Sequence, residues 1–67
     1  MSNEALGQMH RLTAKIEELG GKVPEPWPWA IIKESKYKGR RRVRVDMALW
    51  NLQLLETLEK LQKENRQ

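Results

Sequence analysis

The segment KESKYKGRRRVR, which runs from Lys33 to Arg44, decides both the fold and the charge distribution of this chain. It holds seven basic residues and one acidic residue, so its formal charge is +6. The whole chain has a formal charge of +4, and the residues outside the segment therefore sum to −2. Such a concentrated positive charge predicts a polyanionic or acidic partner.

The same segment and its flanks have the pattern of a β-hairpin, which we predict over about residues 29–45. Basic and apolar residues alternate from Arg42 to Val45, and Gly39 ends a polar stretch that is suited to a turn. Two registers fit, with Ile32 opposite Val43 and Glu34 opposite Arg41 in one, and with Ile31 opposite Val45 and Glu34 opposite Arg42 in the other.

In both registers the second strand has an apolar face and a basic face, because side chains alternate along a strand. Val43 and Val45 lie on the first face, and Arg40, Arg42 and Arg44 lie on the second. An isolated two-stranded hairpin is marginally stable in water. We therefore expect the valine face to rest on a helix.

A helix is predicted on the N-terminal side, over about residues 3–19. Its apolar residues recur at spacings of four and three, as on one face of a helix; they are Ala5, Met9, Leu12, Ile16 and Leu19. Gly20 and Gly21 end the helix, and a connector follows over residues 20–28. Three prolines at alternate positions stiffen this connector.

A second helix is predicted over about residues 47–64, with Asp46 as its N-cap. It carries two apolar stripes: Met47, Trp50, Leu54, Leu58 and Leu61 form one, and Ala48, Leu52 and Leu55 form the other. We predict that one stripe packs within the chain and that a second copy covers the other, with an interface that includes Leu52, Leu55, Leu58 and Leu61. The alternative is a monomer in which the hairpin and the first helix cover both stripes.

The 67 residues predict one small α+β domain over residues 1–67: helix, connector, hairpin and long helix. So short a chain buries little apolar surface and needs further stabilisation. The chain has no Cys and a single His, which argues against disulfides and a structural metal. A helix-mediated homodimer remains as the expected source of stability. Because the chain begins with Met and shows no tag, we expect a complete small protein.

The residue inventory argues against an enzyme. The chain has one His and one Asp, and neither a P-loop nor an activated nucleophile is evident. We expect no cofactor. There is no apolar run long enough to cross a membrane and no signal-peptide pattern, so we expect a cytoplasmic, intracellular protein.

The hairpin arginines carry the functional prediction. Alternate strand residues repeat every ~6.6–6.8 Å, close to the roughly 6–7 Å between successive phosphates of a nucleic-acid strand. We predict a small regulatory or accessory nucleic-acid-binding protein, with DNA favoured over RNA. The predicted binding residues are Lys33, Lys36, Lys38, Arg40, Arg41, Arg42 and Arg44.

Other interpretations remain open, including contact with membrane headgroups and a helical oligomerisation module that has no ligand of its own. Charge on a short hairpin can simply prevent aggregation. Alternatively, the protein is an adaptor or inhibitor that binds an acidic surface of a larger partner, with Trp27, Trp29 and Tyr37 as anchors. The two tryptophans also allow two interpretations, a stacking platform for bases or a cap on a small core, and the core is favoured.

Overall fold

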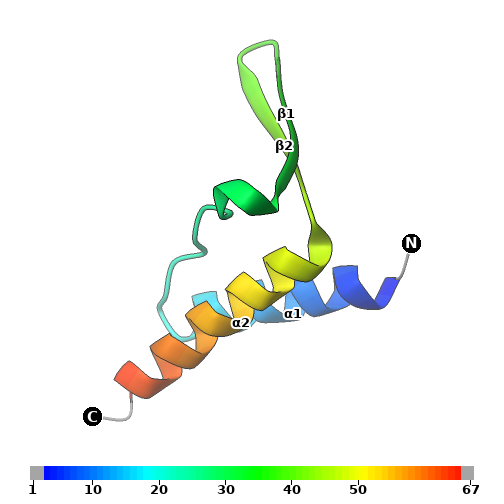
Figure 1. Cartoon of the computed structure of the whole chain (residues 1–67). Coiled ribbons are helices and arrows are strands. Elements are labelled where there is room, and N and C mark those ends of the chain that lie inside the picture. The colour runs from blue at the N-terminus through cyan, green and yellow to red at the C-terminus, as the bar shows by residue number, and fades with distance from the viewer. Residues whose placement is uncertain (1–2, 66–67) are drawn as a thin grey trace.

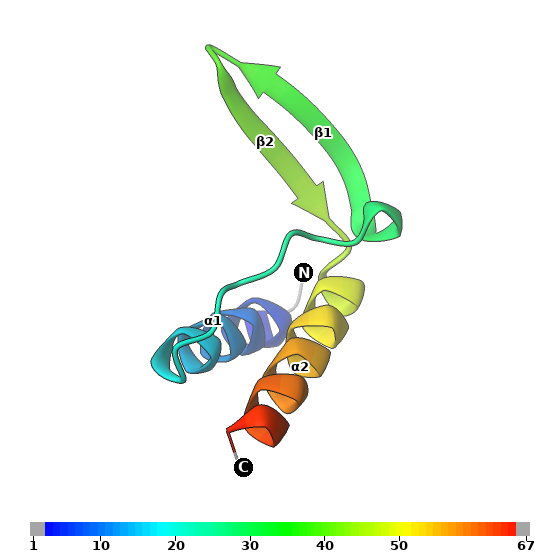
Figure 2. The same cartoon turned by 90° about the vertical axis from the view of Figure 1, so that its left-hand side faces the viewer.

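The computed structural model describes residues 3–65 and is a small α+β fold, as the sequence predicts (Figure 1). In chain order its elements are α1 (Asn3–Glu18), the 3-10 turn η1 (Pro28–Ala30), β1 (Ile31–Tyr37), β2 (Arg40–Val45) and α2 (Met47–Glu64). The two strands form one antiparallel sheet. This hairpin rises away from the pair of helices (Figures 1 and 2).

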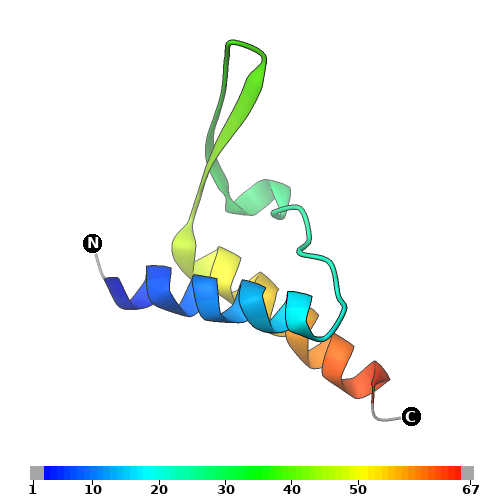
Figure 3. The same ribbon diagram turned by 180° about the vertical axis from the view of Figure 1, so that it is seen from behind.

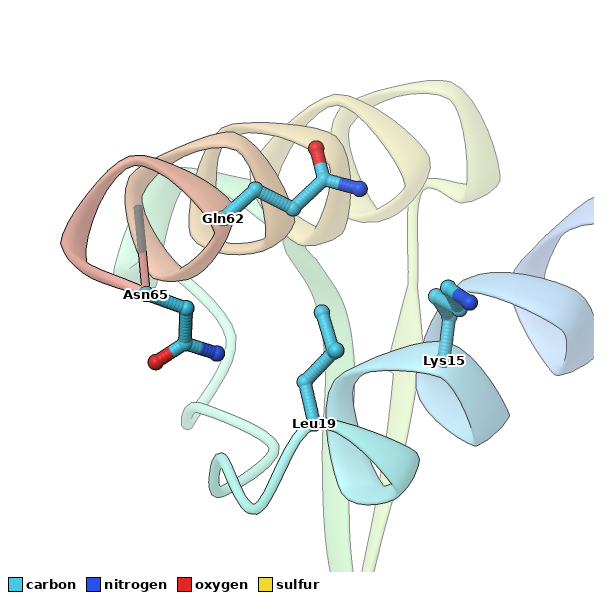
Figure 4. Close-up of a pocket in the computed structure, with 4 residues that line it drawn as sticks. All are labelled: Lys15, Leu19, Gln62 and Asn65. Atoms are coloured by element: carbon cyan, nitrogen blue, oxygen red, sulfur yellow. The ribbon is translucent and has the colours of Figure 1, made fainter. Parts of the chain in front are cut away.

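The two helices lie side by side and run in the same direction (Figures 1 and 3). At their N-terminal ends, the Asn51 side-chain amide donates a hydrogen bond to the Ala5 carbonyl, with N and O 3.0 Å apart. At their C-terminal ends, Leu19 faces the last turns of α2 (Figure 4). Parallel packing is possible because the connector and hairpin return the chain to the starting end before α2 begins.

The core lies between α1 and α2. Its buried residues are Leu12, Ile16, Trp50, Leu54 and Leu58, and Met47 and Leu61 pack against them. The stripe of α2 that runs from Met47 to Leu61 therefore faces α1. Ile16 and Leu54 are fully buried at its centre.

The proline-rich connector is held against α2 by a single glutamine, which is not among the predicted site residues. Gln53 is only 5% exposed. Its side-chain oxygen accepts a hydrogen bond from the Trp27 N–H at 2.8 Å, and its side-chain nitrogen donates to the Glu25 carbonyl at 2.6 Å. Proline has no N–H, so the connector cannot form the regular backbone hydrogen bonds of a strand. The side-chain amide of Gln53 binds the connector backbone instead.

Replacing Gln53 by leucine is expected to destabilise the protein by about 1–3 kcal/mol, because the Trp27 N–H and the Glu25 carbonyl lose their partner. Urea unfolding followed by circular dichroism measures the effect. The matched control is Q62L, because Gln62 is an exposed residue of the same helix. Equal stability of the two variants would show that the connector is not held by Gln53.

The turn of the hairpin is shorter than predicted, and neither predicted register describes the ladder. Lys38 and Gly39 have φ angles of 50° and 78°. Positive φ at both central residues is the pattern of a two-residue type I′ turn, which matches the twist of the flanking strands. The resulting pairs are Lys33 with Arg44, Glu34 with Val43, Ser35 with Arg42, Lys36 with Arg41, and Tyr37 with Arg40.

An irregularity at the base of the hairpin explains why the second predicted register fits at one end only. Ile31 pairs with Val45 as that register requires, but the register shifts between Ile31 and Lys33. Ile32 is the additional residue, as in a β-bulge. The first strand also begins two residues later than predicted, because Trp29 and Ala30 belong to η1.

The prediction that the valine face rests on a helix is wrong for most of the hairpin. Val45 packs against the core, whereas Val43 is only half-buried and lies outside the core. The reason is local. Asp46 follows β2 directly and caps α2, with its carboxylate 3.1 Å from the Leu49 nitrogen. The chain therefore enters α2 directly after β2, and only the base of the hairpin contacts the helices.

Candidate functional site

The hairpin register sorts the basic residues onto two faces, because directly opposed residues of an antiparallel pair share a face. We define the arginine face by Lys33, Ser35, Tyr37, Arg40, Arg42 and Arg44. We define the neutral face by Glu34, Lys36, Arg41 and Val43. The seven predicted binding residues are thus divided: four lie on the arginine face, two lie on the neutral face, and Lys38 lies in the turn.

Arg41 is neutralised by two carboxylates. Its guanidinium lies 2.5 Å from a Glu34 oxygen and 3.3 Å from a Glu25 oxygen. The hydrogen bond with Glu34, reinforced by the charge of that carboxylate, raises the pKa of Arg41 above its ordinary value. Arg41 therefore stays charged at any ordinary pH, and it links the hairpin to the connector.

The arginine face has no such neutralisation. Four of its six residues are cationic and none is acidic. Among the residues described, 3–65, neither Lys33 nor Arg40, Arg42 or Arg44 forms an ion pair, and all four are exposed. The three arginines repeat at every second residue, ~6.6–6.8 Å apart along the strand. This face presents a row of free guanidinium groups.

The aromatic residues do not sit where the favoured interpretation placed them. Trp27 and Trp29 lie outside the core cluster and stack on each other, with ring centroids 5.3 Å apart and planes at 25°. Trp29 is 68% exposed. The core is filled instead by Trp50. Tyr37 is 64% exposed at the tip of the arginine face, and the Lys38 ammonium lies 5.4 Å from its ring centroid.

The structure also divides the predicted oligomer interface. Leu58 is buried in the core and Leu61 packs against it, so both are already covered by α1. Leu52 and Leu55 stay on the surface, 46% and 38% exposed. Two leucines on the N-terminal half of α2 are what remains of the apolar helix surface predicted for a second copy.

Other site classes find little support within the described region. No group of three or more His, Cys, Asp or Glu side chains in residues 3–65 is arranged to hold a metal ion. None of the helices described there is long and apolar enough to cross a membrane. A shallow pocket between the helix ends is lined by Lys15, Leu19, Gln62 and Asn65 (Figure 4).

Comparison with protein-family models, curated proteins and solved structures finds no match for this chain. The function of the chain is therefore inferred from the arrangement of the chain's own residues.

Proposed function

We propose that this protein binds nucleic acid, with duplex DNA favoured over RNA, through the arginine face of its hairpin and without catalysis. One observation carries the proposal. The cations of a projecting two-stranded ribbon differ between its faces: Arg41 on one face is paired with Glu25 and Glu34, whereas the four cations of the other face form no ion pair among residues 3–65.

The segregation of charge argues against a merely protective role. Charges that prevent edge-to-edge aggregation need only be present on the strands. They need not be sorted so that Glu34, the one acidic residue of the two strands, lies on one face and three of the four arginines lie on the other. Arginine also suits bidentate contacts with phosphate or guanine, and the spacing of the row matches successive phosphates.

The proposal predicts binding that depends strongly on salt. When all four cations of the arginine face contact phosphates, log K plotted against log salt should have a slope of about −3.6 for each bound copy, at about −0.9 for each neutralised phosphate. Fluorescence anisotropy with a labelled duplex at several salt concentrations measures this slope. Undetectable affinity for both DNA and RNA at low salt would refute the proposal.

A second candidate function is an adaptor or inhibitor that binds an acidic protein surface. The large exposed area of Trp29 and Tyr37 favours it, because exposed aromatic side chains serve as interface anchors. Replacing Trp27 and Trp29 by alanine separates the two functions. DNA binding by the arginine face should persist if the fold is intact, whereas an interface anchored by aromatic side chains should lose most of its affinity.

We also propose that the protein acts as a homodimer, since two copies would present two hairpins to one duplex and would bind it more tightly than one. The exposed pair Leu52 and Leu55 is one surface that could serve this purpose. The hairpin offers another.

A further inference from the structure

The outer edge of β1 is an unpaired strand edge that stands clear of the helices (Figures 1 and 2). Tyr37 and Arg40 flank the two-residue turn and so form the first hydrogen-bonded pair of the ladder. Hydrogen-bonded and non-hydrogen-bonded pairs alternate from there. The backbone N–H and C=O groups of Glu34 and Lys36 are therefore directed away from β2, where a further strand can bind them.

This edge is complementary to itself in one register. When two copies of β1 pair antiparallel about a two-fold axis at Ser35, Glu34 of each copy lies opposite Lys36 of the other. Lys33 then lies opposite Tyr37, which places a cation beside an aromatic ring. A shift of the axis by one residue in either direction puts Glu34 opposite Glu34 or Lys36 opposite Lys36, and like charges in direct opposition are destabilising.

Lys36 also has no acidic partner among residues 3–65 of one copy. It lies directly opposite Arg41 on the neutral face, and it forms no ion pair among residues 3–65. Glu34 of a second copy would supply the missing acid. The neutral faces would then join in a chain of alternating charges, from Lys36 of one copy to Glu34, Arg41 and Glu25 of the other.

The outer edge of β2 does not allow the same pairing. Four of its six residues are arginines, at positions 40, 41, 42 and 44. Each two-fold register that pairs three or more residues of β2 therefore places arginine opposite arginine, which is unfavourable. Pairing of the β1 edges leaves only these repelling edges exposed, so the assembly stops at two copies.

We propose that two copies of this chain associate through the outer edges of β1 into a four-stranded antiparallel sheet of order β2-β1-β1-β2. The added strand pairing stabilises a hairpin that is marginal alone. It also joins the two arginine faces into one surface with twice the charge. The inference rests on the proposed function for the use of that surface, whereas the association itself is measured without nucleic acid.

Disulfide cross-linking tests the register. The chain has no cysteine, so S35C introduces its only thiol. Across the two-fold axis the two Ser35 residues form a non-hydrogen-bonded pair with Cα atoms about 4.5 Å apart, within the ~4.4–6.8 Å range of disulfides. Mild oxidation should convert S35C into a covalent dimer. The control is K33C, on the same face but with its two thiols roughly 13 Å apart along the strands, and it should form no covalent dimer.

Charge exchange tests the contact independently of any thiol. In E34K alone and in K36E alone, like charges face each other, and each variant should be monomeric. An equimolar mixture of the two restores both opposite-charge pairs, and its mass in sedimentation velocity at low salt should return to about twice the 7.9 kDa of one chain. Recovery in the mixture also shows that both variants fold.

Three results would overturn the proposal. The first is equal cross-linking of S35C and K33C, and the second is a mixture of E34K and K36E that stays monomeric. The third is that the wild type and K36E are both dimers whereas L52K/L55K is a monomer. The last would assign the contact to α2. A dimer that binds no DNA would refute the proposed function and leave this contact standing, and a monomer that binds DNA would do the reverse.

Discussion

Replacing Arg40, Arg42 and Arg44 together by glutamine is expected to weaken DNA binding by about two to three orders of magnitude at ~0.1 M salt. Each of these arginines contributes a free cation to the arginine face. Loss of three phosphate contacts in each copy should also reduce the magnitude of the salt slope by about 2.7 for each bound copy. The folded structure should survive, because all three side chains are exposed and lie outside the core. Fluorescence anisotropy gives both quantities.

The control for this experiment has the same net charge. K22Q/K60Q/K63Q also removes three positive charges, from exposed positions in the connector and in α2. If only the overall charge of the protein mattered, the two triple variants would bind DNA equally weakly. We expect the control to lose less than about tenfold in affinity, since lysines far from the ligand act only through a screened field.

Replacing Leu54 by alanine is expected to cost about 2–5 kcal/mol of folding free energy, through lost burial and a cavity. Leu54 is fully buried at the centre of the interface between α1 and α2. A core in a chain of this size rarely supplies more than ~3–5 kcal/mol. Most of the variant should therefore be unfolded at 25 °C, with loss of helical circular dichroism and a urea midpoint near zero.

Leu55 provides the neighbouring control for this effect. It is the next residue of α2 and remains 38% exposed, so L55A should change the free energy of unfolding by less than about 1 kcal/mol. If L54A and L55A lower the free energy of unfolding by similar amounts, α2 is covered on both faces. That result would fit a monomer in which the hairpin and α1 cover both stripes, or a dimer formed through the helices. A folded L54A would contradict the packing of the core.

The sequence contains strong signals for the two helices and the hairpin. The two apolar stripes predict that α2 packs within the chain by one of them, and the structure buries the stripe from Met47 to Leu61 against α1. Asp46 directly before that stripe predicts where α2 begins. The hairpin follows from the alternation of Val43 and Val45 with arginines, a pattern that only a strand explains.

The register of the hairpin is harder to predict than the hairpin itself, because it depends on the backbone conformation of one turn residue. Lysine seldom adopts positive φ, so the sequence does not favour the two-residue turn of Lys38 and Gly39 that the structure forms. With that turn, Glu34 is paired with Val43 and lies diagonally across from Arg41. The sequence therefore leaves the face of Glu34 open, because Glu34 shares a face with Arg41 in the first predicted register and with Arg42 in the second. The structure places it on the face of Arg41.

The hydrogen bonds between Gln53 and the connector have a recognisable signal in the sequence. A glutamine within an otherwise apolar stretch of helix, in a chain with a segment that lacks every second N–H, is suited to bind backbone groups. The positions of Trp27 and Trp29 had no comparable signal. Whether they enter the core depends on how Trp50 and the leucines fill the space between the helices, which is a property of packing rather than of sequence spacing.

The contrast between Arg42 and Arg41 tests the central claim most directly, because the two residues are neighbours with the same charge on opposite faces of the hairpin. Salt slopes of DNA binding should be measured side by side for wild type, R42Q and R41Q. R42Q should reduce the magnitude of the slope by about 0.9 for each bound copy, and R41Q should leave it unchanged because two carboxylates already neutralise Arg41. Equal slopes for the two variants would contradict the assignment of DNA binding to the arginine face.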